Sequence, residues 1–202
     1  MTRPWDDHYR AEETPWDSGR PEPLFEQAIT NAVLPKSRLL EIGCGTGANA
    51  RLFSHAGYDV VAVDLSPTAI EKARSHPEAD GIEFVVRDVM ADGLPAGPFD
   101  AVIDRGCFHT FQEAEEQHRF AALVAGALRV GGCWLSLIGS TEGAAREVGP
   151  PRRTARDVIL AIEPELELVE LRADHFSRED RPAVWWCLSR NRAVPAQPST
   201  RH

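Results

Sequence analysis

Residues 39–53 read LLEIGCGTGANARLF, and this stretch decides the fold. An apolar run of strand length leads into Gly43, Gly45 and Gly47, which occupy every second position, and a segment with helical spacing follows. A buried strand that turns through a glycine-rich loop into a helix opens nucleotide-binding α/β domains. Such a loop can lie against the phosphates of a dinucleotide or against the methionine end of S-adenosylmethionine. The loop by itself leaves both ligands open.

Strand-like and helix-like segments alternate beyond this stretch. Further apolar runs of strand length lie at 58–64, 82–88, 99–106 and 133–139. Helical patterns lie between them, and the longest covers 113–129, with Gly131 as its expected stop. Alternation of this kind predicts a parallel sheet with helices on both faces.

The last two apolar runs, 165–176 and 182–190, are separated by a short polar turn without a helix. We therefore expect an antiparallel hairpin at one edge of the sheet. The sequence predicts an α/β, Rossmann-like, doubly wound and mostly parallel seven-stranded sheet with a C-terminal antiparallel hairpin. The adjacent Trp185 and Trp186 would point to opposite faces of the last strand, so only one of them would belong to the core.

Three segments organise the chain. Residues 1–36 would form an N-terminal arm and helix that cover the cofactor site. The first twenty or so residues would be mostly irregular, and a helix beginning near Leu24 would be closed by Pro35. Residues 37–190 would form the α/β domain, and residues 191–202 a disordered tail rich in Pro, Ser and Arg.

Composition argues against several classes of function. The 202 residues include 31 acidic and 22 basic side chains, a net charge of −9, without a basic cluster. We expect no nucleic-acid or membrane partner, because both need clustered positive charge. Four scattered cysteines without a CxxC pair predict no metal site and no disulfide framework. The polar N-terminus lacks the apolar run of a signal peptide, so we expect a cytoplasmic protein. The oligomeric state stays open, and a monomer is compatible with the sequence.

Two carboxylates near the loop distinguish the two ligands. Gly43, Gly45 and Ala48 satisfy a loose dinucleotide pattern, and Asp64 ends the second strand, where a carboxylate accepts ribose hydroxyls of either ligand. Glu41 ends the first strand, two residues before the loop. Its charge would repel a pyrophosphate and attract the ammonium and sulfonium groups of S-adenosylmethionine. Glu41 therefore favours S-adenosylmethionine as the cofactor over NAD.

Five successive motifs resemble those of class I S-adenosylmethionine-dependent methyltransferases. They are LLEIGCGTG, VVAVDLSPTAIEKAR, FVVRDVM, FDAVIDRGCFHTF and LRVGGCWLSL, within residues 39–138. TPWDSGRPEPLF near the N-terminus, DRGCFHTF and the closing DHFSREDRPAVWWCLSR resemble the thiopurine, thiol and halide branch, which includes tellurite-resistance-type enzymes. The chain lacks the N-terminal and late insertions that shape the acceptor pocket of the animal thiopurine enzyme. The resemblance therefore implies the cofactor and the reaction but not the acceptor.

The resemblance also implies which residues hold the cofactor. The glycine loop would lie against its methionine part, Asp64 would accept both ribose hydroxyls, and Asp88 with the backbone of Val89 would face the adenine. Trp16 would cover the cofactor as an apolar lid, and Asp17 would lie near its amino group. The full expected set is Trp16, Asp17, Glu41, Gly43, Cys44, Gly45, Gly47, Asp64, Leu65, Asp88, Val89 and Asp104.

Several of these residues have a structural alternative. The glycines would otherwise only form a tight turn from strand to helix. Asp64 would belong to a helix cap that involves Ser66, and Asp88 would be a solvated turn residue. Trp16 would only anchor the arm to the core.

Three residues are candidates for acting on the acceptor. His109 follows the fourth strand and would be a general base, and Arg105 ends that strand beside the methyl-transfer point. Tyr9 would contact the acceptor or, like His109, remove a proton from a phenol or ring nitrogen. His109 has a structural hydrogen-bonding role as its alternative, and Arg105 would otherwise pair with Glu41 or Asp104. Weaker candidates for acceptor contact are His8, Arg152 and Arg153.

The sequence predicts a methyltransferase that acts on a small-molecule acceptor by in-line transfer. The absence of an obvious acid–base pair favours a thiol, a thiopurine or a similar soft nucleophile, which ionises easily. An alternative within the class is an N- or O-methyltransferase of an aromatic heterocycle, phenol or quinol. Alternatives from other classes are an NAD-dependent oxidoreductase and a non-catalytic protein that binds the cofactor.

Overall fold

The computed structural model describes residues 5–143, 151–177 and 181–192. Within these residues, seven strands form one sheet in the order β3-β2-β1-β4-β5-β7-β6. The strands are β1 (Arg38–Ile42), β2 (Asp59–Asp64), β3 (Glu83–Val86), β4 (Phe99–Arg105), β5 (Leu128–Gly139), β6 (Leu166–His175) and β7 (Ala183–Asn191). Strands β1 to β5 pair in parallel, whereas β7 runs antiparallel to both β5 and β6. The predicted sheet and its C-terminal hairpin are confirmed.

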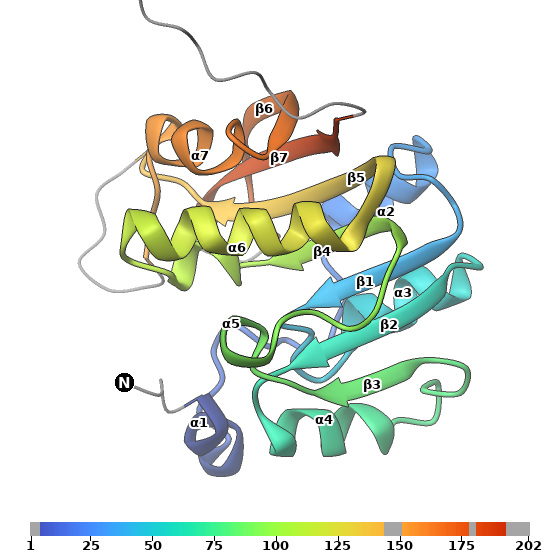
Figure 1. Cartoon of the computed structure of the whole chain (residues 1–202). Helices are drawn as coiled ribbons and strands as arrows, with labels where there is room; N and C mark the ends of the chain where they lie inside the picture. The colour runs from blue at the N-terminus through green and yellow to red at the C-terminus, as the bar shows by residue number, and fades with distance from the viewer. Residues whose placement is uncertain (1–4, 144–150, 178–180, 193–202) are drawn as a thin grey trace, which may run out of the picture.

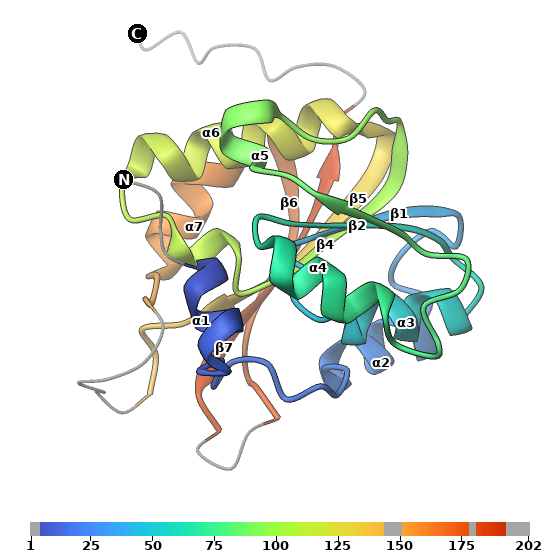
Figure 2. The same cartoon turned by 90° about the horizontal axis from the view of Figure 1, so that it is seen from below.

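Helices cover both faces of the sheet, as Figures 1 and 2 show. One face carries α2 (Pro23–Thr30), α3 (Ala48–His55) and α4 (Pro67–Arg74). The other carries α5 (Val89–Asp92), α6 (Ala114–Ala127) and α7 (Ala155–Ile162). The strand order reverses between β1 and β4, so the carboxyl ends of these strands form the switch point where ligands bind in such sheets.

Short sequence signals fix where the helices begin. The Ser66 hydroxyl accepts a hydrogen bond from the Ala69 amide (3.0 Å) and caps α4, which starts at Pro67. Thr154 and Asp157 form the predicted capping box of α7. These caps satisfy amides that the first turn of a helix leaves without intrahelical partners.

The core lies on both faces of the sheet. Trp186 belongs to the buried cluster that includes Phe25 and Phe53, on the side of α2 and α3. Trp185 belongs to the cluster of Phe120 and Trp134, on the side of α6. The expectation that only one of the paired tryptophans is core was wrong, because helices cover both faces and alternating side chains are therefore buried on both.

The N-terminal arm, residues 5–22, is more ordered than predicted. It contains α1 (Trp5–Ala11), which lies at the carboxyl ends of β1 and β2 (Figure 1). The Asp6 carboxylate accepts hydrogen bonds from the Ser66 hydroxyl (2.7 Å) and the Thr68 amide (3.0 Å). The Lys72 ammonium donates to the Tyr9 carbonyl (3.0 Å). These contacts join residues about 60 positions apart, so local sequence patterns do not reveal them.

Several element boundaries also differ from prediction. Helix α6 ends at Ala127, because Leu128 pairs with Phe99 and begins β5. The register of this pair then shifts, so that Gly131 lies within a bulged part of β5 and not at a helix end. Helix α2 ends at Thr30, well before Pro35.

The predicted tail begins later than expected. Asn191 is the last residue of β7, and its side-chain amide donates to the carbonyls of Leu128 (2.8 Å) and Ala125 (3.2 Å). Residues 193–202 of the predicted tail, and residues 178–180 of the predicted hairpin turn, lie outside the described residues. Within the described part of the chain, no helix is long and apolar enough to cross a membrane.

Candidate cofactor site

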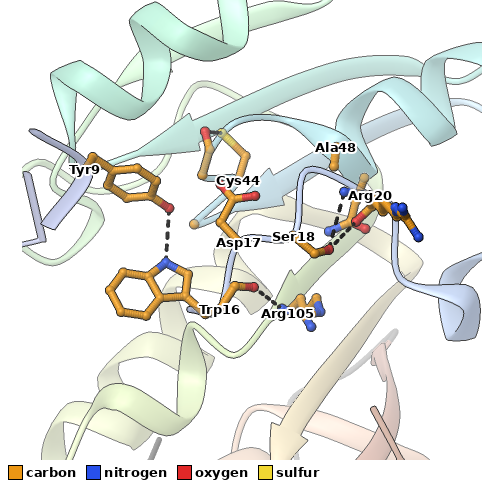
Figure 3. Close-up of a pocket in the computed structure, with 11 residues that line it drawn as sticks. Tyr9, Trp16, Asp17, Ser18, Arg20, Cys44, Ala48 and Arg105 are labelled. Carbon is orange, nitrogen blue, oxygen red and sulfur yellow. Dashed lines mark hydrogen bonds between the residues drawn. The ribbon is translucent and has the colours of Figure 1, made fainter. Parts of the chain in front are cut away.

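A pocket lies between the N-terminal arm and the glycine loop that follows β1 (Figure 3). The sequence predicted seven of its lining residues: Tyr9, Trp16, Asp17, Gly43, Cys44, Gly45 and Arg105. It missed Ser18, Arg20, Ala48 and Asn49. The position of Asn49 in the first turn of the helix that follows the glycine loop was the available sign of this residue. Ser18 and Arg20 stand inside the stretch TPWDSGRPEPLF that carried the family resemblance.

The glycine loop needs its glycines for conformation and for space. Gly43, Gly45 and Gly47 have φ values of 71°, 54° and 78°, in the left-handed region that favours glycine. A Cβ on Gly45 would lie 2.7 Å from the Tyr9 hydroxyl, and one on Gly47 would lie 2.7 Å from the Phe84 ring. The loop is therefore packed against the arm on one side and against the core on the other.

Asp64, at the end of β2, holds this loop. Its carboxylate accepts hydrogen bonds from the Gly45 amide (2.8 Å) and the Ser66 amide (2.9 Å). The side chain is buried, and desolvation raises its pKa. Asp64 therefore makes the contact with Ser66 that its structural alternative predicts. Its carboxylate also lies directly behind the glycine loop. Its contact with ribose hydroxyls stays a prediction.

Glu41, at the end of β1, is buried behind Asn49 and does not line the pocket. One carboxylate oxygen accepts from the Asn49 side-chain amide (3.1 Å), whose own oxygen accepts from the Glu22 amide (2.9 Å). The other oxygen, Oε2, is buried without a hydrogen-bond partner among the described residues. Burial raises the pKa of Glu41 to about 8. A buried acceptor oxygen of this kind fits a cationic group near the loop.

Arg105, at the end of β4, joins three segments. Its Nε donates to the Glu22 carboxylate (2.9 Å), and its Nη1 donates to the Trp16 carbonyl (3.1 Å). Its guanidinium also stacks on Phe176, 4.8 Å from the ring centre. The amide of Ser177 donates to the second oxygen of Glu22 (3.3 Å). The predicted structural partners of Arg105 were wrong, since the carboxylate that it binds belongs to Glu22.

Comparisons with known proteins agree with this fold and loop. Residues 39–132 match the model of a methyltransferase domain. The probable thiol methyltransferase 2 of Arabidopsis thaliana is 30% identical over 151 residues, which are 73% of this chain and 65% of that protein. A structure solved for the conversion of a disulfide bond into a thioacetal group during echinomycin biosynthesis is similar over 95% of this chain and 92% of that one. Its TM-score is 0.82, at 26% identity.

The chain is similar to class I S-adenosylmethionine-dependent methyltransferases, in the domain match of residues 39–132 and in its fold. The thiocyanate methyltransferase 1 of Arabidopsis thaliana is a further relative, 35% identical over 104 residues, which are 50% of this chain and 45% of that protein. The matches thus span less than two thirds of the length of these two plant proteins. The family resemblance drawn from the sequence motifs is confirmed.

The residues around the loop fit the cofactor of this family in charge. S-adenosylmethionine carries positive charge at its sulfur and amino group, and negative charge only at its carboxylate. Asp17, Glu41 and Asp64 lie at or behind the loop, and Glu41 Oε2 is a buried acceptor without a described partner. The guanidinium groups of Arg20 and Arg105 are the cations that line the pocket. The acidic residues suit the two positive groups of S-adenosylmethionine, and the fewer cations suit its single carboxylate.

The N-terminal arm lies closely on the glycine loop. Trp16 is surrounded by the rings of Trp5, His8 and Tyr9, at centroid distances of 5.3, 5.4 and 6.3 Å. The cavity left between arm and loop has a volume of about 60 Å³. Ligand pockets typically measure ~300–1,000 Å³. Binding of the whole cofactor therefore requires that Tyr9 and Trp16 move away from Gly45.

Asp104, at the end of β4, does not support the cofactor role that the sequence suggested. It is fully buried and does not line the pocket. One oxygen accepts from the amides of Cys107 (3.1 Å) and Phe108 (3.0 Å), and the other accepts from the Trp134 indole (3.0 Å). Burial raises the pKa of Asp104 to about 6. Its carboxylate organises the turn after β4, including the short 3-10 helix Phe108–Thr110.

His109 lies in that 3-10 helix, and its hydrogen bonding favours the structural alternative over the role of general base. It is buried, and its Nδ1 accepts a hydrogen bond from the Gly139 amide (2.7 Å). The neutral ring then carries its proton on Nε2, so it offers no proton-accepting nitrogen to a substrate. The Arg153 guanidinium donates to the His109 carbonyl (2.9 Å) and to the Phe111 carbonyl. His109 ties the turn after β4 to the end of β5.

Tyr9 lines the pocket, whereas the residues predicted to face the adenine lie outside it. The Tyr9 hydroxyl accepts from the Trp16 indole (3.3 Å), and burial followed by the nearby Asp64 charge raises its pKa far above the usual range. Asp88 is not a solvated turn residue, because its carboxylate accepts from the Met90 and Ala91 amides and caps α5. Val89 is buried in the core and Leu65 is half-buried, and neither lines the pocket.

Proposed function

We propose that this protein transfers the methyl group of S-adenosylmethionine to a small thiolate or a similar soft anion. The observation that carries the proposal is that the residues predicted to act as bases are unsuited to that role. His109 accepts a backbone hydrogen bond at Nδ1, and the pKa of Tyr9 is strongly raised. An acceptor that arrives already ionised needs no such base.

The names and charges around the site support the same acceptor class. The plant relatives described above are named thiol and thiocyanate methyltransferases. Arg105 and Trp16 both line the pocket, and the Arg105 guanidinium donates to the Trp16 carbonyl. A soft anion is favoured by a cation together with a polarisable aromatic surface, because its charge is diffuse and weakly hydrated.

Side chains of this fold would serve the reaction mainly by positioning. The cofactor supplies an electrophilic methyl group on a positively charged sulfur. Asp64 would bind the ribose hydroxyls, Asp17 and Glu41 would neutralise the amino group, and Asp88, Val89 and Leu65 would lie near the adenine. Trp16 would close over the reacting atoms and exclude water. The acceptor would be held about 3 Å from the methyl carbon, opposite the sulfur.

The test is a methylation assay of the full chain with a panel of acceptors, read out as S-adenosylhomocysteine formation. The panel contains thiols of different pKa, thiocyanate, iodide, a phenol and an aromatic N-heterocycle. We expect the thiols to be methylated, with a rate that rises about tenfold per pH unit below the pKa of each thiol, because only the thiolate reacts. Turnover confined to the phenol or the heterocycle would contradict the proposal, and cofactor binding without turnover of any acceptor would indicate a binding protein.

His109→Gln provides the matched control for this assay. Because His109 is placed as a structural residue, the pH dependence of the variant should keep the shape of the wild type and shift only with the thiol used. A profile that flattens in His109→Gln would restore the base role and would favour an acceptor that has to be deprotonated on the protein.

A further inference from the structure

Arg20 is a cation of the pocket to which no sequence pattern assigned a role. It stands at the C-terminal end of the arm, and its side chain is exposed at the pocket lined by Asp17, Ala48 and Asn49 (Figure 3). Among the described residues, no carboxylate lies within ion-pair distance of its guanidinium. Arg105, the other pocket cation, is already bound to Glu22. Arg20 is thus an exposed positive charge at the edge of the pocket, without a described protein counter-ion.

The local backbone fixes Arg20 at this place. The Arg20 amide donates to the Ser18 hydroxyl (3.3 Å), and the Gly19 amide donates to the Asp17 carboxylate (3.0 Å). The second Asp17 oxygen accepts from the Thr46 amide in the glycine loop (3.2 Å). The turn of residues 17–20 is therefore attached to the loop that faces the methionine part of the cofactor.

The chain just after Arg20 is anchored to the body of the protein. Glu22 is only 3% exposed, and its amide donates to Asn49 while its carboxylate binds Arg105. Entry of the cofactor requires movement of Tyr9 and Trp16, which lie earlier in the arm. Arg20, two residues before the anchor, can keep its position while those rings move.

Charge identifies the part of the cofactor that Arg20 fits. Asp17 lines the pocket and Asp64 lies directly behind the loop, and these two carboxylates suit the amino group and the sulfonium and disfavour the α-carboxylate. A guanidinium binds a carboxylate through two parallel hydrogen bonds. We propose that Arg20 binds the α-carboxylate of the methionine part of S-adenosylmethionine, next to Asp17 on the same turn. This inference rests on the cofactor of the family and not on the proposed acceptor.

Calorimetry with two ligands tests the assignment. S-adenosylhomocysteine carries the α-carboxylate, and decarboxylated S-adenosylhomocysteine lacks only that group. The wild type should prefer the carboxylated ligand by about 10- to 100-fold, the range for a charge-assisted hydrogen bond. Arg20→Gln should lower affinity for the carboxylated ligand to that of the decarboxylated one and leave the latter unchanged. Arg20→Lys, which keeps the charge but not the bidentate geometry, should fall between them.

Arg156→Gln is the matched control, because it removes an equally exposed arginine from α7, outside the pocket. It should keep the wild-type preference, which excludes an effect of net charge alone. The assignment is overturned if Arg20→Gln weakens both ligands equally, if it weakens neither, or if the wild type binds both with the same affinity. None of these outcomes depends on which acceptor the protein methylates, so a failed acceptor screen leaves this test intact.

Discussion

The carboxyl ends of β1 and β2 differ from the carboxyl end of β4 in what satisfies their buried acids. Glu41 keeps one oxygen without a described partner, and Asp64 binds two amides directly behind the glycine loop. Asp104 accepts three hydrogen bonds from its own turn and from the Trp134 indole. All three acids end adjacent strands of one sheet. A buried acid at a strand end therefore indicates a ligand site only when the protein leaves part of its hydrogen-bonding capacity unused.

Other polar side chains near the glycine loop also differ from those after β4 in whether they line the pocket. Around the loop, Asp17 and Arg20 line the pocket and carry opposite charges. After β4, His109 is committed to the Gly139 amide and does not line the pocket. The first region is arranged to bind, whereas the second is arranged to hold the turn that supports Arg105.

The largest expected effect tests the structural side of this comparison. Asp104→Ala should lower the free energy of unfolding by about 3 kcal/mol, because it leaves buried amide and indole donors unpaired. Glu41→Gln is the matched change on the binding side and should cost less than about 1 kcal/mol, since the bond from Asn49 is kept and Oε2 has no partner to lose. Urea denaturation followed by tryptophan fluorescence measures both. Equal losses in the two variants would remove the distinction.

The second effect tests the binding side. Asp64→Ala should weaken binding of S-adenosylhomocysteine by ~1–3 kcal/mol, the scale of lost charge-assisted hydrogen bonds, because the ribose contacts and the support of the Gly45 amide disappear. Asp104→Asn is the control and should leave that affinity unchanged in protein that remains folded. Isothermal titration calorimetry measures both affinities, at a temperature below the unfolding transitions of the two variants. Unaltered affinity in Asp64→Ala would contradict its role toward the ribose.

The third effect is a pH dependence that belongs to Glu41. Its folded-state pKa is raised from 4.5 to about 8, so between these values the folded state binds more protons than the unfolded state. The free energy of unfolding should therefore fall as pH rises towards 8, by up to ~1.4 kcal/mol per unit, and level off above 8. The raised pKa of Asp104, about 6, acts in the same direction at lower pH.

Denaturation measured between pH 6.5 and 8 separates Glu41 from Asp104. Glu41→Gln should flatten the decline in this window, because glutamine does not titrate. Asp104→Asn should leave it in place, since the contribution of that acid is largely complete below pH 6.5. An unchanged slope in Glu41→Gln would mean that protonation of Glu41 does not cause the decline in stability.

The sequence by itself determined the sheet, its hairpin and the glycine loop. These follow from local patterns: alternating apolar runs, the Ser66 and Thr154 caps, and glycines where φ is positive. It also placed Glu41, Asp64 and Asp104 correctly at strand ends, because a strand of known register fixes where its last residue lies. Such signals act over a few residues, so they can be read along the chain.

Only the tertiary structure decided what those residues contact. The partner of Arg105 is Glu22, 83 positions away. The carboxylate of Asp6, in the arm, accepts hydrogen bonds from Ser66 and Thr68 at the start of α4. Hydrogen-bond capacity is used up by whichever donors the folded chain brings near, and no local pattern records which ones these are. For this reason His109 and Asp104 looked like site residues in the sequence, whereas Asn49 and Arg20 emerged as pocket residues only once the arm was folded against the loop.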